Sequence, residues 1–287
     1  MTSVETAHPD GSVATSGPWP FVTLQSQRTG DHETIWYARA HRKGLQSPHA
    51  SAPKIVTPFW QSATYNWTIG ALFALGASLF LLGSTLTLIH IASGWTANSL
   101  ISVTFFLGSI PFTGAAALQH FQSANAADFL QAPAGKVRRS KVHVLGWQAG
   151  SLGWLSTATQ LLGTVAFNFN TFDAIDPPAN WITQDLVIWL PGLAGAILFL
   201  VSGTLAYLEA GHAYFSWKPA SLAWRITFVN LLGCIFFMAA GALSYVPEHP
   251  EPSWVQTAAV INLWIGALGF FVGALLLMRE SRLPASP

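Results

Sequence analysis

Residues 186–208 read LVIWLPGLAGAILFLVSGTLAYL, an apolar run that contains no charged side chain. A transmembrane helix needs about 20 predominantly apolar residues to cross the hydrocarbon core of a bilayer. Other apolar runs of comparable length precede and follow this one. We therefore predict an all-α integral membrane protein, a bundle of six transmembrane helices at residues 67–90, 99–120, 143–166, 186–208, 225–246 and 255–278.

The composition of the 287-residue chain agrees with this class of protein. Charged residues make up 9% of the chain, whereas soluble domains carry about 25%. Because so few charges cannot cover a globular surface, lipid must cover much of it. The net charge of +1 argues against a nucleic-acid partner. The single cysteine, Cys234, argues against a disulfide framework and a cysteine-rich metal site.

The N-terminal segment, residues 1–65, differs from the rest and is expected to be a cytosolic tail. Its opening stretch to about Pro20 is rich in Gly, Pro, Ser and Thr, which is typical of disorder. A short helix is predicted within Asp31–Lys43, because acidic residues come early and basic residues late. Its basic residues could bind anionic lipid headgroups or face water, and they are Arg39, Arg42 and Lys43.

The basic residues predict the orientation of the chain in the membrane. All 13 fall in the N-terminal tail, in the links after the second and fourth predicted spans, or in the C-terminal tail. Because basic links stay in the cytosol, both termini are expected there, in a multi-pass protein of the cell membrane. The predicted domains are the tail at 1–65, the transmembrane domain at 66–280 and a cytosolic tail at 281–287.

A short repeat occurs in every predicted span: a glycine, a small residue, two variable positions, and then Phe or Trp. The copies are Gly76-Ala-Ser-Leu-Phe80, Gly108-Ser-Ile-Pro-Phe112, Gly150-Ser-Leu-Gly-Trp154, Gly195-Ala-Ile-Leu-Phe199, Gly233-Cys-Ile-Phe-Phe237 and Gly266-Ala-Leu-Gly-Phe270. Residues i and i+4 share a helix face, so a glycine notch lies one turn from an aromatic side chain. We predict that these glycines let neighbouring helices pack closely. A groove for a lipid or pigment is the alternative.

The predicted spans group as three tandem hairpins of one orientation, at residues 67–120, 143–208 and 225–278. Units of two helices built on Gly-Ser/Ala-x-x-Phe resemble the YrhK-like family of small bacterial membrane proteins. The best matches are Leu193-Ala-Gly-Ala-Ile-Leu-Phe-Leu-Val-Ser-Gly-Thr-Leu with Glu209, and Trp264-Ile-Gly-Ala-Leu-Gly-Phe-Phe-Val-Gly-Ala with Glu280. The resemblance covers residues 66–280, implies the architecture, and brings no established activity with it.

Polar residues in the third predicted span are the candidates for lining a cavity. Gly153, Ser156, Gln160 and Thr164 share one helix face. Such a stripe forms hydrogen bonds between helices or lines a pore, and Asn230 and Asn262 pose the same choice. No Asp, Glu, Lys or Arg lies near the centre of a predicted span, which argues against a proton-coupled pump.

A metal site is the weaker candidate. Four potential ligands collect near the cytosolic ends of the predicted spans, namely His120, His143, Glu209 and His212. They come from separate spans, and residues reaching toward water explain them equally well. We therefore expect no bound metal, and no haem either, since His90 lacks a second axial ligand at matching depth.

The sequence contains no catalytic motif that would identify an enzyme. The leading hypothesis is a non-enzymatic structural, accessory or interaction role, with another membrane protein or a second copy as partner. The alternatives are a channel or facilitator for a small neutral solute and a metal-responsive protein. A continuous polar cavity beside Ser156 and Gln160 would favour the channel or facilitator.

Overall fold

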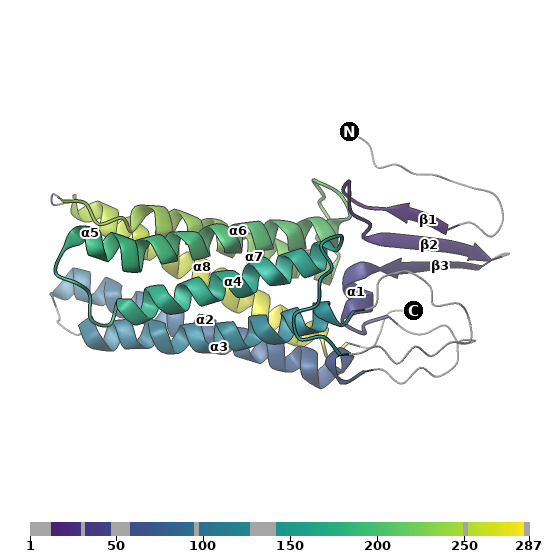
Figure 1. Ribbon diagram of the computed structural model, residues 1–287, viewed down its shortest axis with the longest axis horizontal. Coiled ribbons are helices and arrows are strands. Elements are labelled where there is room, and N and C mark those ends of the chain that lie inside the picture. The colour runs from purple at the N-terminus through teal and green to yellow at the C-terminus, as the bar shows by residue number, and fades with distance from the viewer. Residues whose placement is uncertain are drawn as a thin grey trace.

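The computed structural model describes residues 13–29, 32–46, 58–94, 98–126, 142–248 and 252–283. Long helices run side by side as one elongated bundle, and a small sheet projects from one end of it (Figure 1). We call this end of the bundle the sheet end and the opposite one the far end. The long helices are α2 (Ala63–Ser93), α3 (Asn98–Ala124), α4 (Leu152–Asp173), α6 (Leu190–Gly211), α7 (Leu222–Leu243) and α8 (Ser253–Glu280).

Five helical stretches of the described chain are long and apolar enough to cross a membrane. They are Ala63–Ser93, Asn98–Ala124, Trp181–Gly211, Leu222–Leu243 and Trp254–Glu280. The structure is therefore that of a helical membrane protein. Helix α4 is not among the five, and hydroxyl and amide side chains such as Ser156 and Gln160 make it more polar than its neighbours.

Two helix starts differ most from the sequence prediction. The third helix begins at Leu152 rather than at residue 143, because Ser151 caps it by accepting a hydrogen bond from the Trp154 backbone N–H. Gly146 precedes it with a φ of 52°, a conformation that glycine adopts without strain. The fourth helix starts earlier than residue 186, as α5 (Trp181–Gln184), and continues through a π-helical turn, η2 (Asp185–Trp189), into α6.

The N-terminal segment folds into a sheet, which corrects two sequence predictions. Strands β1 (Val13–Ser16), β2 (Leu24–Thr29) and β3 (His32–Tyr37) pair antiparallel in that order. The stretch predicted as disordered thus contains β1, while residues 1–12 lie outside the described residues. Of the stretch Asp31–Lys43, in which a short helix was predicted, only Ala38–Arg42 is an α-helix, α1. The residues before it, His32–Tyr37, form β3. Ile35, Trp36 and Tyr37 favour a strand, and pairing with β2 outweighs the dipole argument.

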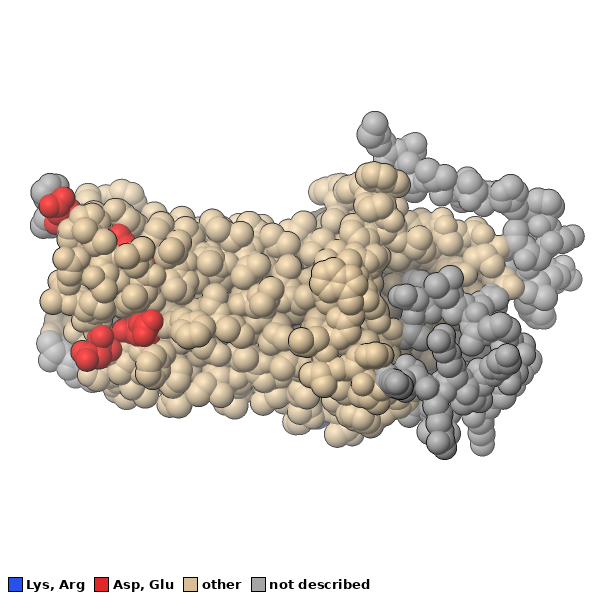
Figure 2. Space-filling model, in the orientation of Figure 1, with Lys and Arg blue, Asp and Glu red and all other residues tan. Residues whose placement is uncertain are grey.

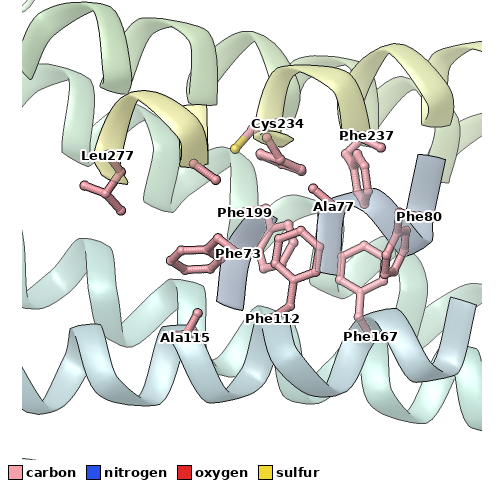
Figure 3. Close-up of a cluster of buried hydrophobic side chains, with 14 of the residues drawn as sticks. Phe73, Ala77, Phe80, Phe112, Ala115, Phe167, Phe199, Cys234, Phe237 and Leu277 are labelled. Carbon is pink, nitrogen blue, oxygen red and sulfur yellow. The ribbon is translucent and has the colours of Figure 1, made fainter. Parts of the chain in front are cut away.

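The long helices form a closed ring. Each packs against the next along the chain, and α8 packs against α2 to complete the ring. The core is a cluster of phenylalanine rings that point toward one another across the bundle (Figure 3). Phe80 and Phe112, for example, meet edge to face with ring centroids 5.6 Å apart, a favourable arrangement for aromatic pairs.

In three consecutive helix pairs, each helix has a glycine against which a phenylalanine ring of the other helix packs. A Cβ on Gly76 would lie 2.5 Å from the Phe112 ring, and one on Gly108 would lie 2.9 Å from the Phe80 ring. The same reciprocal contact joins α4 to α6 and α7 to α8. The partners there are Gly163 with Phe199, Gly195 with Phe167, Gly233 with Phe270, and Gly266 with Phe237. Each glycine makes room for a ring of the neighbouring helix.

One predicted packing glycine is misplaced. Gly150 precedes α4, and nothing lies within 4 Å of where its Cβ would be. The notch in this helix is Gly163, in the copy Gly163-Thr-Val-Ala-Phe167. The predicted motif has a small residue after the glycine, and it therefore includes Gly150, which is followed by Ser151, and omits Gly163, which is followed by Thr164.

The two ends of the bundle differ in charge. Figure 2 shows acidic side chains gathered at the far end. The acidic residues of the links that meet there are Asp173, Asp176, Asp185 and Glu248. The helix ends near the sheet carry Arg225 and Arg279 instead.

Candidate functional site

Helix α1 inserts into the sheet end of the bundle and places three basic side chains there. Strand β3 leads directly into this helix, and Gly44 ends it with a φ of 68°. The backbone of Gly44 lies against Gln61, just before α2, where any Cβ would be 2.6 Å from the Gln61 carbonyl oxygen. Arg39, Arg42 and Lys43 are thereby held in the mouth of the bundle, 8%, 8% and 4% exposed.

The three cations bind two carboxylates that end long helices. Arg39 donates from both terminal nitrogens to Glu280 of α8, at 2.5 and 2.9 Å. Arg42 binds Glu209 of α6 in the same bidentate way, at 2.5 and 2.8 Å. Lys43 Nζ adds a bond of 2.6 Å to Glu280. Bidentate charge-assisted pairs are the strongest hydrogen bonds available to side chains.

Burial makes this cluster sensitive to the loss of any member. Removing one partner of a buried ion pair typically costs about 3–5 kcal/mol, because the other charge stays buried and unpaired. Three cations face two carboxylates, so one positive charge is in excess. Burial lowers the pKa of Lys43 to about 7, repulsion from Arg39 and Arg42 lowers it too, and Glu280 opposes the shift.

The two carboxylates occupy equivalent positions of the repeat. Counted from the motif glycine, the same position holds Gln122 in α3, Glu209 in α6 and Glu280 in α8. Gln122 binds no cation. Its amide donates to the Trp60 carbonyl oxygen and, at 3.0 Å, to Asn66 Oδ1, while Asn66 donates to the Lys43 carbonyl oxygen at 2.9 Å. All three positions therefore attach the N-terminal segment to the bundle, two of them through charge.

A cavity of about 80 Å³ lies on the inner side of the ion pairs, between the helices. A cavity of this size holds several water molecules. Its wall toward the sheet is formed by Arg39, Arg42 and Glu209. Its polar lining comes from four helices and consists of Gln119, Ser156, Thr157, Gln160, Ser202, Thr227 and Asn230.

Phenylalanine rings form the other end of the cavity. Phe73, Phe112, Phe199 and Phe270 line it there, and Figure 3 shows the first three pointing into the core of the bundle. Along α6, the interval from Phe199 to Glu209 corresponds to about 15 Å of helix rise. The cavity thus occupies the half of the bundle that adjoins the sheet and ends at the phenylalanine cluster.

Part of the hydrogen-bonding capacity of the lining is unused. Gln119 Oε1 is buried and has no hydrogen-bond partner among the described residues. Asn230 Nδ2 reaches Cys234 Sγ at 4.0 Å, a weak contact, whereas Ser156 Oγ donates to the Ser202 carbonyl oxygen at 3.0 Å. A buried amide oxygen without a partner is costly, so the cavity favours water or a ligand that can donate to it.

The sequence prediction identified part of this lining. Ser156, Gln160 and Asn230 line the cavity. Thr164 does not; it adjoins a separate space of about 10 Å³ among phenylalanines and bonds to its own helix. The Asn262 amide likewise donates to the Ala258 carbonyl oxygen of its own helix.

Gly153 lies on the same face of α4 but does not line the cavity; it makes room for the side chain of Arg42. A Cβ at this position would overlap the Arg42 guanidinium. Glycine is therefore required there for Arg42 to reach Glu209. In α7 the equivalent position after the capping serine, Ser221, is Ala223.

The four potential metal ligands do not meet at one point. The two ring nitrogens of His120 lie 3.2 Å from Thr157 Oγ1 and 3.0 Å from the Leu145 carbonyl oxygen. His143 is exposed, Glu209 binds Arg42, and His212 Nδ1 lies 3.0 Å from Thr23 Oγ1. Within the described ranges, no group of three or more His, Cys, Asp or Glu is arranged to hold a metal.

The ion pairs were not foreseen from the sequence, although a signal for them exists. Glu209 and Glu280 sit at the same position of two repeat copies, at the ends of otherwise apolar helices. Carboxylates in that setting need cationic partners. The basic residues expected to meet lipid headgroups are those partners, so headgroup contact by Arg39, Arg42 and Lys43 would require them to leave the mouth of the bundle.

Comparisons with protein-family models, with curated proteins and with solved structures find no match for this chain. The class of protein is therefore defined by the fold and the site: a helical membrane protein with a central polar cavity. Its function has to be argued from the cavity and from the residues that surround it.

Proposed function

We propose that this protein is a facilitator that binds a small uncharged polar solute in its central cavity and allows it to cross the membrane. In this proposal α4 is a sixth span, the three helix pairs are parallel tandem repeats of the YrhK-like kind, and both termini face the cytosol. The protein has no enzymatic activity and belongs to the cell membrane.

Two observations support this placement in the membrane. The basic helix ends lie near the sheet and the acidic links at the far end, as expected if the sheet end faces the cytosol. Helix α4 packs between α3 and α6 and makes the same glycine–phenylalanine contacts with α6 that join the other pairs. Its polar face turns toward the cavity, which explains how a helix of lower hydropathy fits among apolar neighbours.

The cavity is the observation that carries the proposal. Amide and hydroxyl groups from α3, α4, α6 and α7 converge on it, and Gln119 Oε1 has no hydrogen-bond partner in the part of the chain that the structure describes. The carboxylate in its wall, Glu209, is already bound by Arg42. A lining with paired charges and free amide groups suits a small neutral solute with hydroxyl or amide groups.

Solute flux tests this function. Liposomes that contain the purified protein are mixed rapidly with a solution of glycerol or urea, which sets a concentration gradient across the membrane. The change in vesicle volume is followed by light scattering. We expect faster equilibration than in protein-free vesicles. Replacing two of the three lining amides, Gln160→Leu with Asn230→Leu, should slow it severalfold, because the solute loses hydrogen-bond partners in a desolvated site.

Asn262→Leu provides the matched control, because this amide bonds to its own helix and lies outside the cavity lining. It should leave the flux unchanged. The facilitator would be contradicted if solute flux equalled that of protein-free vesicles both in the wild type and in a variant whose Arg42–Glu209 ion pair is broken. The second candidate, a structural or accessory role, would then be preferred, and it draws support from the interlocked helix pairs.

A further inference from the structure

The wall that closes the cavity on the sheet side belongs to a segment that is not part of the helix ring. Arg39 and Arg42 line the cavity, yet they lie on α1, which follows the three-stranded sheet. In Figure 1, α1 sits at the end of the long helices with the sheet extending away from them. Helix α1, the last element of this segment, therefore covers the mouth of the cavity without belonging to the ring of long helices.

This segment is attached by polar contacts. None of the buried hydrophobic residues of the described chain lies in residues 13–46, while Thr23, Arg39, Arg42 and Lys43 are buried. Besides the ion pairs, the His212 ring bonds Thr23 at 3.0 Å and packs against Tyr37 with centroids 5.3 Å apart. The hydroxyl of Tyr214 donates to the Trp19 carbonyl oxygen at 2.5 Å.

We propose that residues 13–29 and 32–46 are a removable plug, which closes the cavity when Arg39 and Arg42 bind Glu280 and Glu209 and opens it when they release. The proposal rests on the proposed function, since it assigns the regulation of the same cavity. We call residues 13–29 and 32–46 the plug.

The physical basis for reversible closure is the nature of the contact. A buried ion pair replaces hydration that its charges regain when they separate into water, so attraction and desolvation nearly offset each other. Apolar packing has no such compensation, because exposed hydrocarbon is not solvated favourably. A plug held by charge and hydrogen bonds can therefore leave and return, whereas one held by a shared apolar core would not.

The excess of positive charge in the cluster of ion pairs also favours release of the plug. Lys43 is the third cation beside two carboxylates, and it shares Glu280 with Arg39. The third equivalent position of the repeat carries Gln122 instead of a carboxylate. When Lys43 is protonated, the closed arrangement therefore contains one unbalanced positive charge, which favours opening, whereas a third glutamate would have balanced it.

The chain carries its own reporter of opening. Cys234, the single cysteine, is buried and lines the cavity. A small water-soluble reagent such as aminoethyl methanethiosulfonate forms a mixed disulfide with a thiol that it can reach. The rate of Cys234 modification, followed by intact mass on full-length protein in detergent, therefore measures access to the cavity independently of solute flux.

The decisive variant is Arg42→Glu, which changes the plug and leaves every residue of the bundle in place. It sets a carboxylate against Glu209, so we expect modification of Cys234 to be faster by about tenfold or more, since loss of a buried ion pair shifts an equilibrium at least that far. Adding Glu209→Arg restores an opposite-charge pair in reversed order and should return the rate toward that of the wild type. Cys234→Ser should show no modification.

Neutral replacement guards against a folding defect in the charged variant. Arg42→Gln with Glu209→Gln removes both charges of this ion pair, leaves no new unpaired charge, and should give an intermediate rate. An unchanged rate in both Arg42→Glu and the neutral pair would overturn the plug, as would a failure of Glu209→Arg to reverse the Arg42→Glu effect in protein that melts normally.

The two proposals fail in different ways. If Arg42→Glu exposes Cys234 but carries glycerol and urea no faster than protein-free vesicles, the plug stands and the facilitator is wrong. If the wild type carries solute while both variants leave Cys234 access and flux unchanged, the facilitator stands and the plug is wrong.

Discussion

Glu209 and Glu280 show how a single residue acquires its role in this protein. Each is a carboxylate at the end of an apolar helix, bound by an arginine that lies 167 and 241 residues away in the chain, respectively. An uncompensated carboxylate at such a position is unfavourable, so the sequence indicates that each needs a cation. It does not indicate which cation, because several basic residues lie on the same side of the predicted bundle.

Side-chain size explains why the motif identified Gly150 instead of Gly163 as the packing glycine of the third predicted span. Thr164 follows Gly163, and threonine is larger than the residues that follow the other motif glycines. It nevertheless fits, because its hydroxyl bonds the Leu161 carbonyl oxygen at 2.7 Å within the helix. A motif defined by residue volume alone excluded a position that local hydrogen bonding makes acceptable.

His212 gives a pH dependence at this scale. Burial, and secondarily Lys218, lower the pKa of His212 to about 4, against the opposing influence of Glu209. Between about pH 4 and 6.5 the unfolded chain therefore binds a proton that the folded protein does not, so this residue removes stability as the pH falls through that range. The melting temperature of the wild type in detergent should drop more from pH 7 to pH 5 than that of His212→Asn.

Asparagine is the suitable replacement there, because residue 212 has a φ of 57° and asparagine tolerates this left-handed conformation. The comparison uses the difference between the two proteins, which cancels the other titrating groups. Equal drops in melting temperature for wild type and His212→Asn would show that His212 titrates normally.

At the scale of elements, the length of the apolar runs predicted the long helices well, whereas the charge pattern of residues 31–43 was misleading because strand pairing competes with a helix there. The apolar stretches are helical because a helix satisfies its own backbone hydrogen bonds, a property that depends on local sequence. Residues 32–37 are a strand because β2 supplies partners for them, a property of the neighbouring segment. The charges near this region suggested a helix dipole, which is worth less than a ladder of hydrogen bonds.

The glycine–phenylalanine contact between α4 and α6 carries a prediction of its own. Gly163→Leu should lower the melting temperature in detergent, because a side chain there would meet the Phe199 ring, with its Cβ already 2.7 Å from it. Overpacking of this kind typically costs about 1–3 kcal/mol. The matched control is Gly150→Leu, since nothing lies within 4 Å of that Cβ position.

Comparing the two variants isolates the effect of packing, because both introduce leucine. Gly163 lies within α4, and Gly150 lies just before it. Similar melting temperatures for Gly163→Leu and Gly150→Leu would show that close approach at the motif does not stabilise the bundle.

At the scale of the whole molecule, the proposed orientation predicts opposite exposure for the two ends. Single cysteines in the Cys234→Ser background would replace Ala179 at the far end and Ala220 near the sheet, both exposed positions. A membrane-impermeant thiol reagent applied to intact cells should label position 179 and leave position 220 unlabelled until the cells are opened. The reverse pattern would invert the topology.

The sequence by itself determined that the chain forms long apolar helices and belongs in a membrane, because length and apolar composition are local properties of each segment. It also located Ser156 and Gln160, since residues on one helix face follow from the helical period, and Asn230, as an amide within an apolar run. The tertiary structure decided that the ring closes through α8 and α2, that these three side chains face a common cavity, and that α1 covers its mouth. These features depend on contacts between segments far apart in the chain, and the energy of a buried charge depends on the partner that docking brings to it.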